Sequence, residues 1–146
     1  MLCFLLKGIP LEDLQHFSVK DYNPAGLTAL YDAISEGVRL VEKDKKPEDR
    51  VICVIMTDGE ENASKETTKI QIKNIISRHE SEGDWTFLYI GENPVKWSQD
   101  SGISLGNTAD FDHIDGSQNF VKACLGVSNL RRSGSEIKQS KDLLNK

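Results

Sequence analysis

The chain alternates short apolar runs with longer segments in which apolar residues recur every three or four positions. Unbroken apolar runs predict buried strands, and the three-to-four spacing predicts amphipathic helices. We expect strands at residues 1–6, 51–56 and 85–90, and a short strand between residues 103 and 111. We expect helices from residue 27 to about 43, after Ser64 up to "SEGD", from Asn93–Pro94 to Gly102, and around residues 120–127.

Strands that alternate with helices predict an α/β fold of three layers: an open, mostly parallel, Rossmann-like sheet between helices. The run "VICVIM" at residues 51–56 is apolar throughout, so we expect this strand to be buried on both faces. Residues 11–23 read as a loop with one helical turn at most. The domain is expected to span residues 1–132, followed by a polar tail at 133–146.

Composition narrows the range of functions. The chain has 146 residues, enough for one domain with a sizeable core, and a net charge of -5 that argues against nucleic acid as a partner. We expect no membrane span, because the apolar runs are too short. Cys3, Cys53 and Cys124 are widely separated and lie in apolar runs, which predicts buried, reduced thiols and a cytoplasmic location.

An acidic cluster follows the run at residues 51–56 directly, in the order "TDGEEN". Carboxylates are costly beside an apolar interior unless a helix N-terminus, a basic side chain or a metal ion pairs with them. In open parallel sheets, ligands collect at the carboxyl ends of the strands, and Asp58 lies at such an end. We therefore expect a site at Asp58.

Three segments in order, "YNPAGLTALYDAI", "VIMTDGEENAS" and "WTFLYIGENPVKWSQDSGISLGNTADF", resemble bacterial members of the von Willebrand factor type A (vWA) domain family. The resemblance covers roughly residues 4–132. It implies a non-enzymatic module that recognises a protein partner through Mg²⁺ at a metal-ion-dependent adhesion site. Thr28 and Asp58 map onto the family's second and third metal-binding loops.

The family's first metal-binding motif, Asp-x-Ser-x-Ser, does not occur in this sequence; "DGSQN" near the C-terminus stands in another context. Residues 1–6 align with the family's third strand, so the chain is read as a fragment or a shortened, degenerate relative. Two ligand loops in place of three predict weak Mg²⁺ binding. We also expect residues 1–6 to move inward beside residues 51–56, and a homodimer to form through an exposed sheet edge.

Other functions stay open at this point. Asp58, Glu60 and Glu61 could together hold Mg²⁺ for a hydrolase or a phosphoryl-transfer enzyme. A metal-free structural remnant is the third reading.

Simpler roles for single residues also stay open. Thr28 could be only a helix cap, and Asp58 only a turn residue before Gly59. Glu60 and Glu61 are expected to be solvated, and Asp32 to benefit from a helix N-terminus. The three histidines, His16, His79 and His113, are expected to be exposed, and the two tryptophans, Trp85 and Trp97, to pack in or beside the core.

Overall fold

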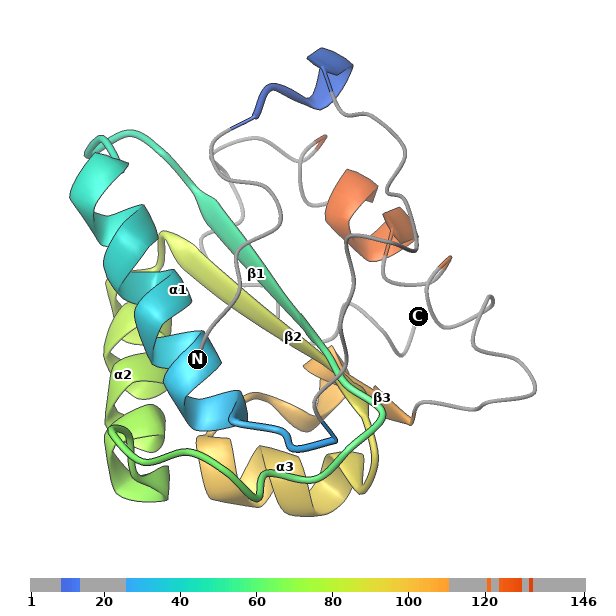
Figure 1. The fold of residues 1–146 in the computed structure, drawn as a ribbon. Coiled ribbons are helices and arrows are strands. Elements are labelled where there is room, and N and C mark those ends of the chain that lie inside the picture. The colour runs from blue at the N-terminus through green and yellow to red at the C-terminus, as the bar shows by residue number, and fades with distance from the viewer. Residues whose placement is uncertain (1–8, 14–25, 111–120, 122–123, 130–131, 133–146) are drawn as a thin grey trace.

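Three parallel strands form one open sheet with the order β1-β2-β3 in the computed structural model (Figure 1). The strands are β1 (Val51–Met56), β2 (Trp85–Gly91) and β3 (Thr108–Asp110). Val51 pairs with Trp85 at the start of β2, and Tyr89 near its end pairs with Thr108. The α/β class and the parallel sheet are thus confirmed. The structure describes residues 9–13, 26–110, 121, 124–129 and 132.

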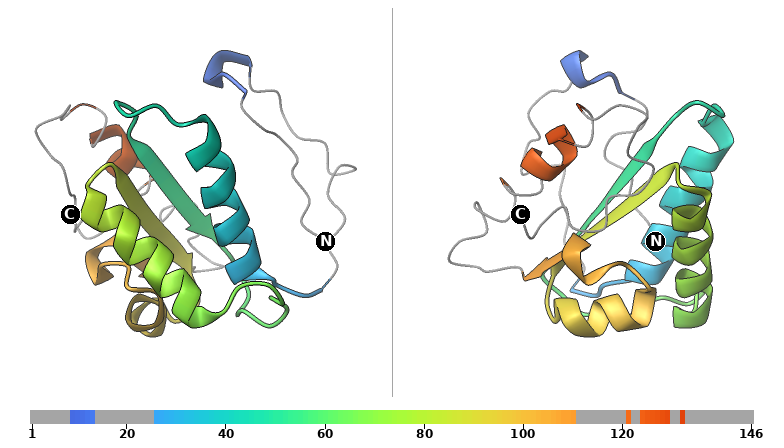
Figure 2. Two further views of the ribbon diagram at one scale, coloured as in Figure 1. Left: turned by 90° about the vertical axis from the view of Figure 1, so that its left-hand side faces the viewer. Right: turned by 180° about the vertical axis from the view of Figure 1, so that it is seen from behind.

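The sheet has helices on both faces. The helices α1 (Leu30–Asp44) and α2 (Lys69–Glu82) lie side by side against one face, and residues 124–129 are helical on the other (Figure 2). The helix α3 (Pro94–Ser101) lies at the carboxyl end of the strands. Single 3-10 turns occur at η1 (Leu11–Asp13) and η3 (Leu105–Asn107). Among the described residues, no helix is long and apolar enough to cross a membrane.

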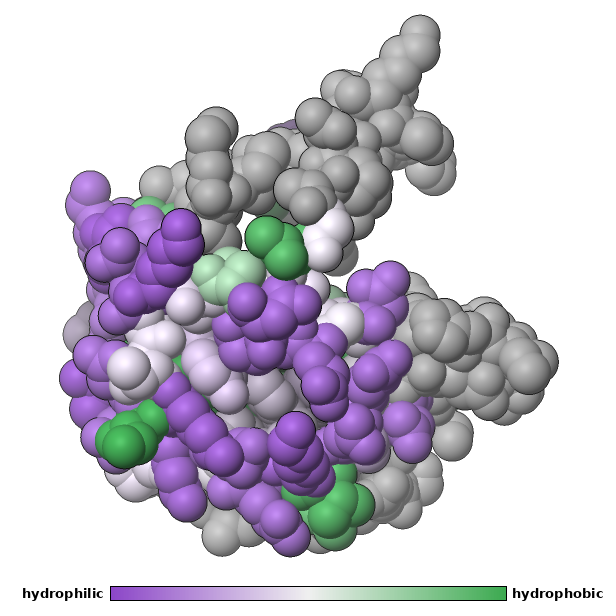
Figure 3. All heavy atoms as spheres, turned by 60° about the horizontal axis from the view of Figure 1, so that its bottom comes forward, coloured by the Kyte–Doolittle hydropathy of each residue, from purple (hydrophilic) through white to green (hydrophobic). Residues whose placement is uncertain are grey.

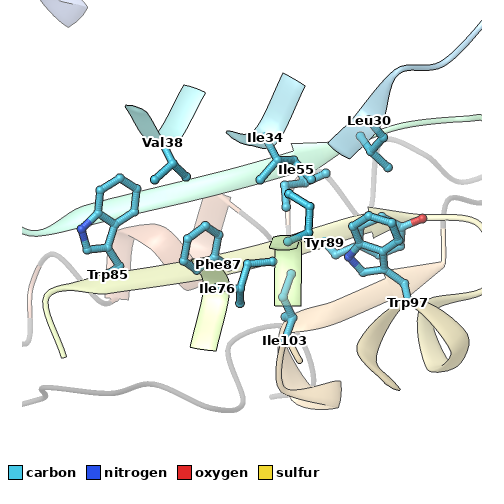
Figure 4. Close-up of a cluster of buried hydrophobic side chains, with 11 residues drawn as sticks. Leu30, Ile34, Val38, Ile55, Ile76, Trp85, Phe87, Tyr89, Trp97 and Ile103 are labelled. Carbon is cyan, nitrogen blue, oxygen red and sulfur yellow. The ribbon is translucent and has the colours of Figure 1, made fainter. Parts of the chain in front are cut away.

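The main core lies between the sheet and the α1/α2 layer (Figure 4). Leu30, Ile34 and Val38 recur every fourth residue, so they form one stripe on α1 that faces the sheet. Against this stripe pack side chains from the strands and the other helices: Ile55, Ile72, Ile76, Trp85, Phe87, Tyr89, Trp97 and Ile103. A smaller cluster on the opposite face joins Leu88 and Ile90 to Ile52, Ala109 and Val127.

Helix ends follow local capping chemistry, with two corrections to the expected positions. The N-cap of α2 is Thr68, whose hydroxyl accepts from the Gln71 amide while the Gln71 side chain accepts from the Thr68 amide. Ser64 is therefore not the cap. Helix α1 begins at Leu30 after Ala29, which has no capping side chain, so Thr28 is not a cap either. Gly83 and Gly102 end α2 and α3 in the left-handed conformation, as expected.

The prediction that residues 51–56 are buried on both faces was wrong. Val54 and Met56 are each 45% exposed, on the face away from α1 and α2. Every residue of β2 is buried. The reason is position: β2 has a strand on each side, whereas no described strand flanks the outer edge of β1.

Several other expectations need correction. Cys124 is exposed rather than buried, and His79 is buried, 2% exposed, against the ring of Trp85. The Cys53 side chain packs on the main core, and burial raises its thiol pKa to about 11. Some apolar residues of the expected helices are largely exposed: Ile70, Val121 and Leu125. The expectations for residues 1–6 and 133–146, and for Cys3, His16 and His113, lie outside the described residues.

Candidate functional site

The acidic cluster lies in the β1–α2 loop, residues 57–68, at the carboxyl end of β1. The loop passes the first turn of α1 and runs near α3 (Figure 1). It therefore occupies the place where open parallel sheets collect ligands. The contacts of its carboxylates differ along its length.

Glu61 binds the N-terminus of α1 and its own loop. Its Oε2 accepts from the Tyr31 amide at 2.8 Å and from the Ser64 hydroxyl at 2.7 Å. Its Oε1 accepts from the amides of Ala63 and Ser64, at 3.0 and 2.8 Å. The expectation that Glu61 is a solvated loop charge was therefore wrong. Because Ala29 cannot cap α1, a carboxylate 30 residues along the chain from Tyr31 does so.

Asp32 makes the reciprocal contact from α1 to the loop. Its carboxylate accepts from three successive amides, Lys65 at 2.8 Å, Glu66 at 3.1 Å and Thr67 at 2.7 Å. The Asp32 amide in turn donates to the Ser64 hydroxyl at 3.1 Å. The Glu61 carboxylate thus binds the first turn of α1, and the Asp32 carboxylate binds the amides of residues 65–67. These two contacts hold the loop and the start of α1 together.

These contacts set the charge state of both carboxyl groups. The pKa of Asp32 is lowered mainly by the hydrogen bond from the Lys65 amide, with further bonds from Thr67 and Glu66. Burial by itself would raise the pKa of Glu61, but the amides of Ser64, Tyr31 and Ala63 and the Ser64 hydroxyl bring it below its usual value. Both groups are therefore ionised at neutral pH.

Thr28 is also hydrogen-bonded to the β1–α2 loop. Its amide donates to the Asn62 side-chain oxygen at 2.8 Å, and its carbonyl accepts from the amides of Asn62 and Ala63 at 3.0 and 3.2 Å. Its hydroxyl faces Gly59, since a Cβ placed on Gly59 would lie 2.9 Å from Thr28 Oγ1. A side chain at position 59 would displace Thr28, so the contact depends on glycine.

The fold thus brings the two sequence-predicted site residues to the same place, although they are far apart in the chain. Thr28 touches Gly59, and Asp58 is the neighbour of Gly59. Thr57 holds the turn, because its hydroxyl accepts from the Gly59 amide at 3.1 Å and donates to the Gly59 carbonyl at 2.9 Å. No described residue hydrogen-bonds to the Thr28 hydroxyl or to the exposed Asp58 carboxylate.

Glu60 points to the other side of the loop. It is exposed, accepts from the Asn93 side chain at 3.3 Å and lies 3.8 Å from the Lys96 ammonium group at the start of α3. Its expected solvation is confirmed. Asp58, Glu60 and Glu61 therefore have separate surroundings rather than one shared centre.

An aromatic stack supports this end of the sheet. Trp97 on α3 stacks on Tyr89 with ring centroids 4.7 Å apart, and on Tyr31 at 5.9 Å. The Tyr89 hydroxyl donates to the Glu92 carbonyl at 2.9 Å, and burial raises its pKa to about 12. A Cβ on Gly91 would collide with that hydroxyl. The floor beneath the loop is therefore closely packed and fixed.

The oxygens of Thr28 and Asp58 are of the kind that binds a hard cation, but they are too few to complete its coordination shell. A hydroxyl and a carboxylate are ligands that Mg²⁺ accepts, and both oxygens lack a described protein partner. In the described part of the chain, however, no group of three or more His, Cys, Asp or Glu side chains is placed to hold a metal ion. Thr28 and Asp58 alone would leave most of an octahedral shell to water and to a partner's oxygens.

The surface around the loop is polar. Viewed from the carboxyl end of the strands, the described residues are largely hydrophilic, with hydrophobic side chains in separate spots (Figure 3). Such a face offers hydrogen bonds and charge rather than a broad apolar contact.

The structural roles of Glu61, Ser64 and Asp32 were missed by the sequence analysis. One local signal was available: Ala29 stands where α1 needs a capping oxygen, so that oxygen had to come from elsewhere. Comparisons with protein-family models, with curated proteins and with solved structures found no match for this chain.

Proposed function

We propose that this chain is a non-enzymatic binding module of the vWA type that recognises a protein partner at the carboxyl end of its sheet. Thr28 and Asp58 would face the partner, directly or through a weakly held Mg²⁺. When bound, Mg²⁺ would supply a Lewis-acidic bridge to a carboxylate of the partner. We also expect the module to work in the cytoplasm; the described cysteines, Cys53 and Cys124, are free thiols.

The observation that carries this proposal is the contact between Thr28 and Gly59 beside Asp58. Thr28 and Asp58 are 30 residues apart in sequence, and the Thr28 hydroxyl still lies against the turn that contains Asp58. The Thr57 hydroxyl bonds to the Gly59 amide and carbonyl and holds that turn, and the Asn62 side chain holds Thr28 by accepting from its amide. A turn whose backbone is already held loses little entropy on binding.

The hydrolase or phosphoryl-transfer alternative is less well supported. It needs Asp58, Glu60 and Glu61 together on Mg²⁺, but both oxygens of Glu61 accept hydrogen bonds from Tyr31, Ala63 and Ser64. Releasing Glu61 to a metal ion would remove the cap of α1. In the third reading, a metal-free structural remnant, Thr28 and Asp58 would have no binding role, and the same experiment separates it from the proposal.

The test is capture of partners from a lysate of the source cells, with magnesium or with EDTA. We expect a protein that the wild type retains and Asp58→Ala loses, while the matched loop variant Glu60→Ala retains it. Loss of the partner in EDTA would assign a role to the cation, and retention would mean that the partner contacts Thr28 and Asp58 directly. Equal capture by wild type and Asp58→Ala would overturn the proposed site.

A further inference from the structure

The outer edge of β1 carries backbone hydrogen-bonding groups that no described strand pairs with. The amides of Val51 and Thr57 donate toward β2, to the carbonyls of Asp84 and Ile90 at 2.8 and 3.1 Å. Residues of the other parity, Ile52, Val54 and Met56, therefore direct their amides and carbonyls to the opposite edge. No described residue pairs with them there.

The sequence of β1 itself lacks the features that usually prevent strand addition. The sequence "VICVIM" has no proline, no lysine and no inward-pointing charge. Val54 and Met56 are each 45% exposed. Beside the start of the strand lies a groove of about 700 Å³, with an apolar floor and a charged rim, lined by Leu40, Val41, Asp44, Lys45, Asp49, Arg50, Val51 and Ile52.

We propose that β1 pairs in antiparallel register with β1 of a second copy of this chain, about a twofold axis at Val54. In this register Val54 lies opposite Val54 of the second copy, and Ile52 lies opposite its Met56. All three residues direct their backbone groups to the edge, so the hydrogen bonds of the two strands match. The three described strands of each copy then form one continuous sheet with β1 at its centre, which covers the edge of both copies.

Charge selects the second copy as occupant and Val54 as the centre. Arg50 and Asp58 flank the strand, and each is four residues from Val54. The twofold axis therefore brings Arg50 of one copy opposite Asp58 of the other, twice per dimer. A register centred on Ile52 or Met56 would separate these charges. Opposite charges at the ends of an apolar strand favour one register and one partner.

The same register also gives the groove an occupant. The residues that follow Met56 in one copy would run past Arg50, Val51 and Ile52 of the other, which line the groove. The groove would then receive the turn that begins at Thr57. This dimer does not depend on the proposed binding function, although Asp58 takes part in both.

The first test reverses the charges of Arg50 and Asp58, singly and together. The size of the protein particles is measured by sedimentation over a range of protein concentrations. EDTA is present so that cation binding plays no part. We expect concentration-dependent dimers for the wild type, and association weaker by about tenfold or more for Arg50→Asp and for Asp58→Arg, because each brings like charges together. The double variant should restore association. A wild type that stays monomeric, or single variants that associate as the wild type does, would overturn the proposal.

The second test reads the register directly. With Cys3 and Cys124 replaced by serine, Val54→Cys places two thiols across the axis, where paired Cα atoms are about 5.5 Å apart and a disulfide can form. Mild oxidation should give a covalent dimer. The control is Val95→Cys on α3, a comparably exposed valine away from the edge. Equal cross-linking of the two variants would contradict the register.

Discussion

The two halves of the β1–α2 loop use their carboxylates in opposite ways. In residues 61–67, the Glu61 carboxylate and the amides that bind Asp32 join the loop to α1 through short hydrogen bonds. In residues 57–60, Asp58 and Glu60 are exposed, and Asp58 has no described partner. One half is therefore structural, and the other is available for a ligand. An acidic cluster in sequence need not be one site.

The largest expected effect comes from Glu61→Ala. The change leaves the Tyr31 amide at the start of α1 without its acceptor and frees residues 63 and 64. Loss of a helix cap and of charged hydrogen bonds should lower the free energy of unfolding by about 2 kcal/mol. The matched control is Glu66→Ala, an exposed loop glutamate. Chemical denaturation would contradict the comparison if the two variants lost equal stability.

Acid should weaken the structural half. The pKa values of Glu61 and Asp32 are lowered in the folded chain, so their contribution is present above the ordinary values of 4.5 and 3.8 and is lost as pH falls below them. Glu61→Gln removes one of these titrating groups. Its stability should change less than that of the wild type between neutral pH and acid. Parallel pH profiles of the two proteins would show that Glu61 is not held ionised by these contacts.

A smaller effect is expected at the junction of the two halves. In Gly59→Ala the added Cβ would lie 2.9 Å from Thr28 Oγ1, so the hydroxyl or the turn must move. Such overpacking should cost about 1 kcal/mol and should displace the amide signals of Thr28 in an NMR spectrum. Gly37→Ala is the control, because a Cβ there meets nothing within 4 Å. An unchanged Thr28 signal in Gly59→Ala would mean that the two segments are not in contact.

The smallest effect on stability is expected from Asp58→Ala. The carboxylate is exposed and accepts no hydrogen bond from a described residue, so the free energy of unfolding should change by no more than about 0.5 kcal/mol. Thermal melting in EDTA, at a protein concentration below that of dimer formation, measures this. A loss as large as that of Glu61→Ala would place Asp58 in the structural half.

Sequence patterns predicted the order of elements well, because helices and strands follow local periodicity. The ends of α2 and α3 were read from Gly83 and Gly102, which adopt the left-handed conformation. The neighbours of each element were harder to predict. The run "VICVIM" is the more apolar of the two and "WTFLYI" the less, yet β2 is buried throughout and β1 has two side chains 45% exposed. The apolar character of a run reflects its composition, whereas the burial of a strand depends on which strands lie beside that strand.

The candidate site was predicted only in part, because sequence patterns show where strands end but not which distant residues come into contact. Asp58 could be placed at a strand end from sequence, because strand ends follow from the pattern. The role of Glu61 could not, because it depends on a contact with a residue 30 positions away. His79 was misjudged in the same way: its neighbours in sequence are polar, but the fold packs it on Trp85 and within 3.2 Å of Glu42.

The most direct test of the division within the loop is a titration with Mn²⁺, a paramagnetic substitute for Mg²⁺, followed by NMR. With only two protein ligands, we expect no saturable binding at micromolar levels, and line broadening at about millimolar cation that is centred on Thr28, Asp58 and Gly59. Asp58→Asn should abolish the broadening, and Glu61→Gln should preserve it. Broadening that survives Asp58→Asn, or that disappears in Glu61→Gln while the fold is intact, would contradict the account.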